Sequence, residues 1–336
     1  MPDTAPALNI VFHGGAAAPF MDSVAALLAT APHMTAVSEA VDRPGEREAW
    51  QHADVIVGMR LDASLPPPLR LRLLHAPSAG TDGVQTALLP PGAMLCNCFG
   101  HEDAIAEYVM AALLLRHLPL AMADADLRQG RWTYLAGRPG ALRTELGTTR
   151  LGLLGWGHIA QAVARRARAF GMRITVANRS AVSAEAAERA GVDQAFGLGE
   201  LNAFMASADA IVVTLPLAAS TAGIVGAEAL AAMRPGAVLV NVARGPVVDE
   251  QALFDALSRQ SIGGAVIDTW YQYPSADRPE CPPSQLDFAS LPNVLMTPHM
   301  SGWTDAMLQR RRHTLADNIT RLTDGRPLVN VLHTGG

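Results

Sequence analysis

The chain has 336 residues, of which 49% are hydrophobic and 17% are charged, and its formal net charge at pH 7 is −5. This length is enough for two globular domains, each with its own core. All 26 basic residues are arginine, which excludes chemistry that needs a lysine Schiff base or a Walker-type phosphate lysine. With a negative net charge and no dense basic stripe, the chain is not expected to bind nucleic acid.

The three cysteines, Cys96, Cys98 and Cys281, form no cluster with histidines at metal-ligand spacing, so no metal site is expected. No basic segment precedes the first apolar run, and we therefore expect no secretory signal peptide. The apolar run over residues 108–115 is too short to span a bilayer. These features predict a cytoplasmic protein with no membrane association.

The N-terminal part has the pattern of an α/β domain. Strands are predicted at residues 8–12, 54–58 and 71–75, and a helix at 21–29. The last of these strands leads into the glycine-bearing loop Ser78-Ala79-Gly80. Loops at this end of an open α/β sheet bind ligands. A long helix is predicted next, from about residue 103 to residue 129, with an arm or linker after it that reaches residue 149.

Residues 150–179 carry the pattern of a dinucleotide-binding βαβ unit. An apolar strand leads into the turn Gly155-Trp156-Gly157-His158-Ile159-Ala160, and a helix and a second apolar strand follow. Gly155 permits the tight turn, and Gly157 lets a pyrophosphate approach the helix N-terminus, where free N–H groups favour anions. The alternative is an ordinary tight turn, which this strand–turn–helix–strand setting disfavours.

The end of the second strand reads Asn178-Arg179-Ser180. An acidic residue there would bind the adenosine ribose 2′-OH and indicate NAD. No carboxylate is present at this strand end to repel a 2′-phosphate. Arg179 is able to pair with such a phosphate. We interpret this as a preference for NADP. The alternative is that Arg179 is a solvated loop residue and that either cofactor binds.

Further apolar strands follow at residues 210–216, 237–242, 264–268 and 294–297, and they predict a mostly parallel sheet. Three of them lead into polar segments, which begin at Asn241, Asp268 and Thr297. The carboxyl ends of such strands face the cofactor crevice. A C-terminal helix is predicted at residues 305–323.

With the glycine turn, these segments resemble the D-isomer-specific 2-hydroxyacid dehydrogenase family over most of the chain. The resemblance implies two Rossmann-like, doubly wound α/β domains with parallel sheets and an active-site cleft between them. The first domain, residues 1–103, would be completed by residues 300–336. The dinucleotide-binding domain would comprise residues 104–299.

The resemblance also assigns roles to single residues. His299 matches the general acid/base, a task that suits imidazole because its ordinary pKa is near 6.5. Arg244 matches the arginine that holds the substrate carboxylate, with Ser78, Ala79 and Gly80 on the other side of the substrate. The implied cofactor-binding set is Gly155, Trp156, Gly157, His158, Ile159, Asn178, Arg179, Ser180, Leu215, Pro216, Thr221, Val242, Ala243, Asp268 and Gly302, with Asp268 on the nicotinamide side.

The chain departs from the family at one catalytic position. Five residues after Asp268, where the family has a glutamate that pairs with the histidine, this chain has Tyr273. A neutral phenol does not stabilise imidazolium as a carboxylate does, so His299 is expected to be less basic and the pH optimum to shift. Glu102 and Asp103, at the start of the predicted long helix, are alternative carboxylates, although their positions also suit ordinary helix N-terminal charges.

The sequence therefore predicts an NADP-preferring oxidoreductase for a small 2-keto or 2-hydroxy acid of the glyoxylate, hydroxypyruvate or pyruvate class. The alternatives are a formate-type or other unusual acid dehydrogenase, and a non-catalytic NAD(P)-sensing binding protein, a role that some relatives play as co-repressors. Similar enzymes dimerise through the long helix and the following arm, which here carries Trp132 and Tyr134, so a homodimer is expected.

Overall fold

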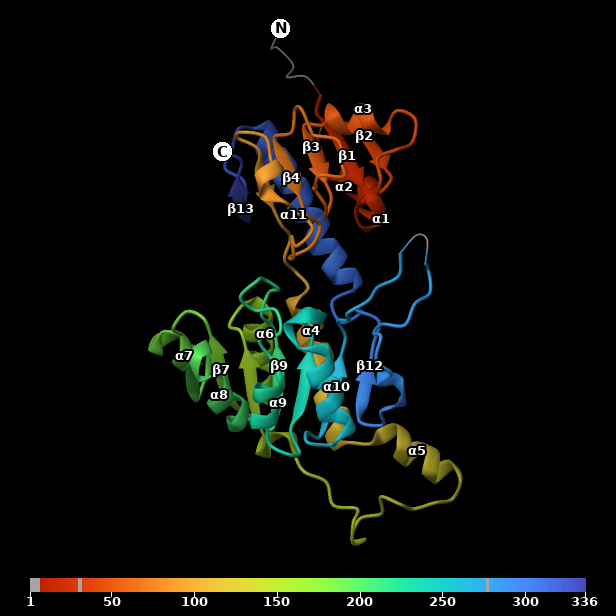
Figure 1. Ribbon diagram of the computed structural model, residues 1–336, viewed down its shortest axis with the longest axis vertical. Helices are drawn as coiled ribbons and strands as arrows, with labels where there is room; N and C mark the ends of the chain where they lie inside the picture. The colour runs from red at the N-terminus through yellow and green to blue at the C-terminus, as the bar shows by residue number, and fades with distance from the viewer. Residues whose placement is uncertain (1–6, 30–31, 276–277) are drawn as a thin grey trace. The chain divides into compact units, whose positions relative to one another are not determined.

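The computed structural model describes residues 7–29, 32–275 and 278–336 (Figure 1). The described chain divides into two compact units. One contains the residues up to Gly100 together with Thr304–Gly336, and the other is His101–Trp303. The start of the chain, on which the expectation of no signal peptide depends, lies outside the described residues. The sequence-based boundaries, after residue 103 and before residue 300, fall a few residues inside the second unit.

The first unit is built on a six-stranded sheet in the order β13-β5-β4-β3-β1-β2. Its strands are parallel except β13, which pairs antiparallel with β5. From β2 to β5 this is the 2-1-3-4-5 order of flavodoxin-like folds. The strands are β1 (Asn9–His13), β2 (His33–Val37), β3 (Val55–Val57), β4 (Leu73–His75), β5 (Met94–Cys96) and β13 (Val331–Thr334).

Helices cover both faces of this sheet because alternate strand residues are apolar on both sides. One core contains Phe12, Val57 and Leu73 with Leu315 of the C-terminal helix, and the other contains Val11 and Ile56 with Trp50. The helices are α1 (Gly14–Ala17), α2 (Met21–Ala25), α3 (Glu46–Gln51) and α11 (Asp305–Thr323). The helix expected at residues 21–29 ends at Ala25.

The second unit is built on a seven-stranded parallel sheet in the order β12-β11-β10-β9-β6-β7-β8. The chain order runs from β6 to β8 on one side and from β9 to β12 on the other, which is the doubly wound arrangement of a dinucleotide-binding fold. Its strands are β6 (Arg150–Leu154), β7 (Arg173–Asn178), β8 (Gln194–Gly197), β9 (Ala210–Val213), β10 (Val238–Asn241), β11 (Gly264–Ile267) and β12 (Val294–Met296).

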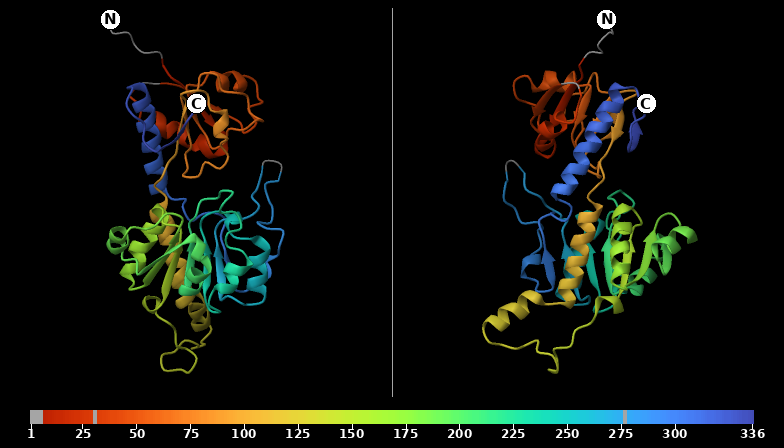
Figure 2. Two further views of the ribbon diagram at one scale, coloured as in Figure 1. Left: turned by 60° about the vertical axis from the view of Figure 1, so that its left-hand side comes forward. Right: turned by 180° about the vertical axis from the view of Figure 1, so that it is seen from behind.

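This sheet is also buried on both faces. Leu151, Leu153 and Val212 belong to the core that includes the helix after the glycine turn, whereas Leu154 and Val213 belong to the core on the opposite face. The covering helices are α4 (Glu102–His117), α6 (His158–Ala169), α7 (Ala184–Ala190), α8 (Leu201–Ser207), α9 (Ala227–Ala232) and α10 (Glu250–Ser258). The predicted pair of doubly wound α/β units is confirmed (Figure 2).

The prediction of a single long helix over residues 103–129 is wrong. It is two helices, α4 and α5 (Leu120–Arg128), which are bent by 49° at the break. Pro119 lies in the break and has no N–H to donate to a helical carbonyl, and Leu118 before it takes φ −124° and ψ 90°. Helix α5 buries no residue, and it stands away from the sheet together with the arm that follows it (Figure 1).

Within the described residues, no single helix is long and apolar enough to cross a membrane. The pair α4 and α5 meets that criterion only when the two bent helices are counted together.

Candidate active site

The polar segments predicted from the sequence lie at the carboxyl end of the seven-stranded sheet. The glycine turn follows β6, and the segments that begin at Asn241, Asp268 and Thr297 lie at the carboxyl ends of β10, β11 and β12. Strand β6 lies between β9 and β7, so the strand order reverses at β6. This reversal leaves a crevice above the carboxyl ends, where open α/β sheets bind their ligands.

The glycine turn has the geometry that a pyrophosphate site requires. Gly155 has a φ of +104°, and an added Cβ there would lie 2.7 Å from the Thr214 hydroxyl, so a larger residue does not fit. Gly157 is the N-cap of α6, and an added Cβ would meet nothing within 4 Å. No described side chain caps this helix. The N-terminal N–H groups of α6 are therefore accessible to an anion.

The turn after β7 presents Arg179 to solvent. The Asn178 side chain donates a hydrogen bond of 2.9 Å to the carbonyl of Ser180 and thereby fixes this turn. In the described part of the chain, the guanidinium of Arg179 has no ion pair or hydrogen bond, and no carboxylate occupies this strand end. Its donors are thus available to an anionic group.

The loops after β9 and β10 are held by side chains that bond back to the backbone. The Thr221 hydroxyl donates to the Pro216 carbonyl at 2.6 Å and accepts from the Ala218 N–H at 2.8 Å. The buried Asn241 amide accepts from the Ala243 N–H and donates to the Arg244 carbonyl, both at 3.1 Å. Asn241 therefore orients the turn that carries Arg244.

Asp268 holds the loop that contains His299. Its fully buried carboxylate accepts hydrogen bonds from the Thr297 hydroxyl at 2.6 Å, from the Met300 N–H at 2.9 Å and from the Ser301 N–H at 3.0 Å. Both carboxylate oxygens are used in these hydrogen bonds, so Asp268 serves to hold the loop in place. Gly302 then passes over α4, where an added Cβ would lie 3.3 Å from His101.

His299 and Tyr273 meet directly. The Tyr273 hydroxyl lies 2.9 Å from Nδ1 of His299, and it accepts a hydrogen bond of 3.0 Å from the Trp270 backbone N–H. His299 adopts a φ of +56°, in the left-handed region that few non-glycine residues occupy. The Trp270 indole donates to the Thr297 carbonyl at 2.8 Å, so Trp270 supports both sides of this contact.

The electrostatics of this pair differ from those of a histidine–carboxylate pair. Desolvation by the surrounding atoms lowers the pKa of His299 from its ordinary value, Asp268 opposes this shift, and Arg244 adds to it. Burial also raises the pKa of Tyr273 above its ordinary value. Both side chains are therefore neutral at neutral pH.

Of the two alternative carboxylates, Asp103 pairs with Arg166 at 3.0 Å, and Glu102 lies at the start of α4 beside two histidines other than His299. Its Oε1 is 3.7 Å from Nδ1 of His101 and 4.0 Å from Nδ1 of His158. His158 is the first residue of α6, so Glu102 faces the glycine-turn side of the site. The group that contacts Nδ1 of His299 is the Tyr273 hydroxyl and not the Glu102 carboxylate.

The loop after β4, in the first unit, has backbone donors that are not used. The Ser78 hydroxyl donates to the Gly80 carbonyl at 2.7 Å, and the Asn97 amide donates to the Ala79 carbonyl at 2.8 Å. These contacts fix the loop through its carbonyl groups. Within the described residues, the N–H groups of Ala79 and Gly80 donate to no protein acceptor.

Four residues that build the site received no role from the sequence, although Asn241 and Thr297 were noted there as the first residues of polar segments. Asn241 and Trp270 orient Arg244 and Tyr273, and Thr297 links Asp268 to the Tyr108 hydroxyl of α4 at 2.7 Å. Asn241 was recognisable as the polar residue that ends an otherwise apolar strand. The Tyr108–Thr297 contact joins residues 189 positions apart, and the Trp270–Tyr273 contact spans only three residues but lies in an irregular loop, so no periodic pattern indicates either. No group of three His, Cys, Asp or Glu side chains in the described ranges is arranged to hold a metal ion.

Residues 109–301, more than half of the chain, match the family model described as D-isomer specific 2-hydroxyacid dehydrogenase, NAD binding domain. The chain is similar to an (S)-sulfolactate dehydrogenase from Chromohalobacter salexigens, with 31% identity over 66% of this chain and 67% of that protein. It is also 30% identical, over 79% of its length, to a D-3-phosphoglycerate dehydrogenase from Methanocaldococcus jannaschii.

The match covers 48% of the M. jannaschii protein, so the chain spans about half the length of that relative. Among solved structures, it is similar to a D-isomer specific 2-hydroxyacid dehydrogenase from Xanthobacter autotrophicus Py2 in complex with NADPH and MES. The two share a TM-score of 0.78 and 24% identity over 98% of each chain. At that identity the likeness concerns the fold.

Proposed function

Since the chain belongs to the D-isomer specific 2-hydroxyacid dehydrogenase family and carries its NAD-binding domain, we propose that it is a 2-keto acid reductase. Its substrate class is a small 2-keto or 2-hydroxy acid such as glyoxylate, hydroxypyruvate or pyruvate. The observation that carries this proposal is the placement of Arg244 and His299 after strands β10 and β12, at the carboxyl end of one Rossmann sheet, where Arg244 adds to the desolvation that lowers the pKa of His299.

The residues divide the work of the reaction by their chemistry. The nicotinamide, when bound, supplies hydride to the substrate or accepts it. Arg244 offers a planar set of donors that suits a carboxylate and the adjacent carbonyl oxygen. The unused amides of Ala79 and Gly80 support a role for that loop in binding a carboxylate. His299 exchanges a proton with the substrate oxygen through Nε2, because Tyr273 lies on Nδ1.

We propose NADP as the preferred cofactor. The exposed guanidinium of Arg179, on a turn fixed by Asn178, suits the 2′-phosphate, whereas the ribose-binding acid of NAD-specific sites is absent from this strand end. The glycine turn fits the pyrophosphate, because Gly157 leaves open space beside the N-terminus of α6.

A panel of 2-keto acids with NADPH and with NADH, followed at 340 nm, tests the proposal. We expect turnover of at least one small 2-keto acid and a lower KM for NADPH. The His299→Ala variant should bind NADPH as the wild type does and should lose turnover, by about 100-fold or more. Binding of NADPH without turnover of any acid would instead support the sensor function.

A further inference from the structure

The hydrogen bonds of the Tyr273 hydroxyl determine which nitrogen of His299 carries the proton. A phenol has one proton to donate and can accept other hydrogen bonds. The Trp270 N–H can only donate, so at 3.0 Å it uses an acceptor position of Oη. The proton of the hydroxyl is then left for Nδ1 of His299, 2.9 Å away.

The other tautomer is less well satisfied. If Nδ1 carried the proton, it would donate to Oη, and the hydroxyl proton would need a different acceptor. The described ranges contain no protein acceptor for it, since the hydroxyl contacts only Trp270 and His299 there, and it would turn to the solvent that reaches the 48% exposed Tyr273. Phenol is the stronger donor and the imidazole nitrogen is the stronger acceptor of this pair, so the hydrogen bond that Oη donates to Nδ1 is the more favourable of the two. Neutral His299 therefore carries its proton on Nε2, the nitrogen turned away from Tyr273.

We propose that Tyr273 is the proton source for reduction and acts through His299, an inference that rests on the proposed function. As C2 of the 2-keto acid receives hydride, Nε2 of His299 gives its proton to the carbonyl oxygen. Nδ1 takes the proton from the Tyr273 hydroxyl, so the imidazole stays neutral. The resulting phenolate keeps the hydrogen bond from the Trp270 N–H. After the product leaves, Nε2 takes a proton from water and Nδ1 returns its proton to the phenolate, which restores the starting state. The substrate gains one hydride and one proton in total.

The charges around the two rings are compatible with this transfer. Burial opposes the phenolate of Tyr273, as does Asp268, whereas the Trp270 N–H and Arg244 favour it. Tyr108 of α4 approaches the same loop through Thr297 and remains protonated, because burial raises its pKa. An alkoxide is a much stronger base than a phenolate, whose parent phenol has an ordinary pKa near 10. Transfer from Tyr273 to the substrate oxygen is therefore downhill once hydride arrives.

The pH dependence of reduction separates this relay from a histidinium donor. With the relay, kcat/KM in the wild type stays level above the pKa of His299 and falls only as Tyr273 ionises, above pH 10. In Tyr273→Phe the relay is lost, so kcat should fall about 100-fold or more, and the remaining activity should decline as pH rises through the pKa of His299, below 6.5. In Tyr273→Glu a carboxylate raises that pKa, and the decline should lie between the other two.

Any profile in which the wild type and Tyr273→Phe decline together below pH 6.5 would overturn the proposal. Circular dichroism and NADPH binding show whether each variant is folded. If Tyr273→Phe does not fold, the pH profiles of the wild type and Tyr273→Glu decide whether the relay operates. The relay requires that kcat/KM of the wild type decline at a higher pH than that of Tyr273→Glu.

The tautomer is tested without cofactor or turnover by ¹⁵N NMR of histidine-labelled protein, with His299→Gln used to assign the signals. At neutral pH we expect Nε2 of His299 to be protonated and Nδ1 to be a hydrogen-bonded acceptor, and we expect this preference to be lost in Tyr273→Phe. Protonation at Nδ1 in the wild type would overturn the relay. If no acid in the panel is reduced, the proposed function fails, and the NMR result still decides the tautomer.

Discussion

At the residue scale, His299 depends on Asp268 for its conformation. A positive φ is unfavourable for histidine relative to the common regions, and it persists where the surroundings determine the backbone. Here the surroundings are the N–H groups of Met300 and Ser301, which directly follow His299 and both donate to the Asp268 carboxylate. Asp268 therefore holds the loop in the conformation that brings Nδ1 to Tyr273.

We expect Asp268→Asn to disorder this loop. An amide offers one acceptor atom in place of two and turns its NH₂ group toward a backbone donor, so at least one buried N–H loses its partner, at a cost of about 1–3 kcal/mol. The variant should have a lower melting temperature and a reduced kcat. Thr297→Val, which removes only one of the three donors to the carboxylate, is the matched control and should have the smaller effect. Equal stability of Asp268→Asn and wild type would contradict this role.

Arg179 is the residue on which cofactor choice depends. We expect Arg179→Ala to weaken NADPH binding by about 1–3 kcal/mol, since a charge-assisted pair with the 2′-phosphate is lost. Affinity for NADH should stay nearly the same. Fluorescence titration of both cofactors measures the two effects, and equal affinities of the wild type for NADPH and NADH would argue against NADP preference.

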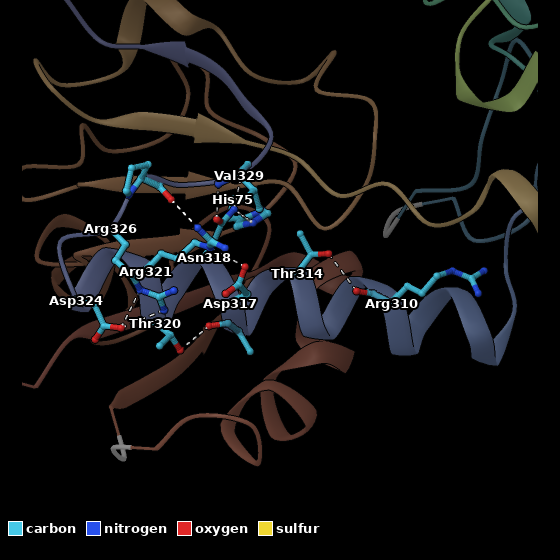
Figure 3. A network of polar contacts seen from close by, with 12 residues as sticks. His75, Arg310, Thr314, Asp317, Asn318, Thr320, Arg321, Asp324, Arg326 and Val329 are labelled. Atoms are coloured by element: carbon cyan, nitrogen blue, oxygen red, sulfur yellow. Dashed lines mark hydrogen bonds and ion pairs between the residues drawn. The ribbon is translucent and has the colours of Figure 1, made fainter. Parts of the chain in front are cut away.

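At the element scale, helix α11 is fastened to the first sheet by a buried polar contact (Figure 3). The Asn318 side chain donates to Nε2 of His75 at 2.9 Å and exchanges two hydrogen bonds with the backbone of Val329. His75, at the end of β4, is fully buried, and burial lowers its pKa to about 4. The histidine must stay neutral for this contact to persist.

This contact makes the stability of the fold depend on pH. The unfolded chain binds a proton at His75 near pH 6.5, whereas the folded chain binds it only near pH 4. The contribution of His75 to the free energy of unfolding is therefore fully present above pH 6.5. As the pH decreases toward 4, protonation of His75 in the unfolded chain lowers the free energy of unfolding by about 3 kcal/mol. Burial also lowers the pKa of His13, which therefore affects stability in the same direction.

The contribution of His75 to the pH dependence of stability is measured by comparing the wild type with His75→Gln. Glutamine keeps an acceptor for Asn318 and does not titrate. Urea unfolding at pH 7, 5.5 and 4.5 should show a shallower loss of stability in the variant. Parallel losses in the two proteins would mean that protonation of His75 is not coupled to unfolding.

At the scale of the whole molecule, helix α5 and the following arm indicate self-association. No residue of helix α5 is buried within its own chain, Leu120 and Met122 are each 62% exposed, and Trp132 in the arm is 57% exposed. Apolar and aromatic groups that gather on a protruding segment are typical of a protein interface. We expect a homodimer with twofold symmetry through this region.

Light scattering at micromolar concentration tests this assembly. The wild type should have twice the chain mass of 35.4 kDa, and Met122→Glu should shift it toward monomer, because the charge would be buried without a partner. Leu69→Glu is the control, since Leu69 is equally exposed, at 62%, and lies in the other unit. A monomeric wild type would refute the expectation.

Local patterns were sufficient where one segment carries the whole signal. The strand β6, the turn at Gly155 and the helix α11 follow from apolar periodicity and glycine placement, because these are properties of neighbouring residues. The strands β2, β5, β8 and β13 received no prediction. Strands β2, β8 and β13 lie at sheet edges and carry many exposed residues, so their sequences lack the apolar run of a central strand.

The residue types thus determine the cofactor-binding unit and the substitution of tyrosine for the usual carboxylate at position 273. They do not determine what Tyr273 contacts. That contact depends on the Trp270 backbone and on His299, which lies 26 residues away in the chain. It also depends on Asp268, whose carboxylate fixes the histidine loop. Hydrogen-bond geometry between residues distant in sequence arises only when the parallel strands bring their carboxyl ends together, and for this reason tertiary structure alone decides the protonation chemistry of the site.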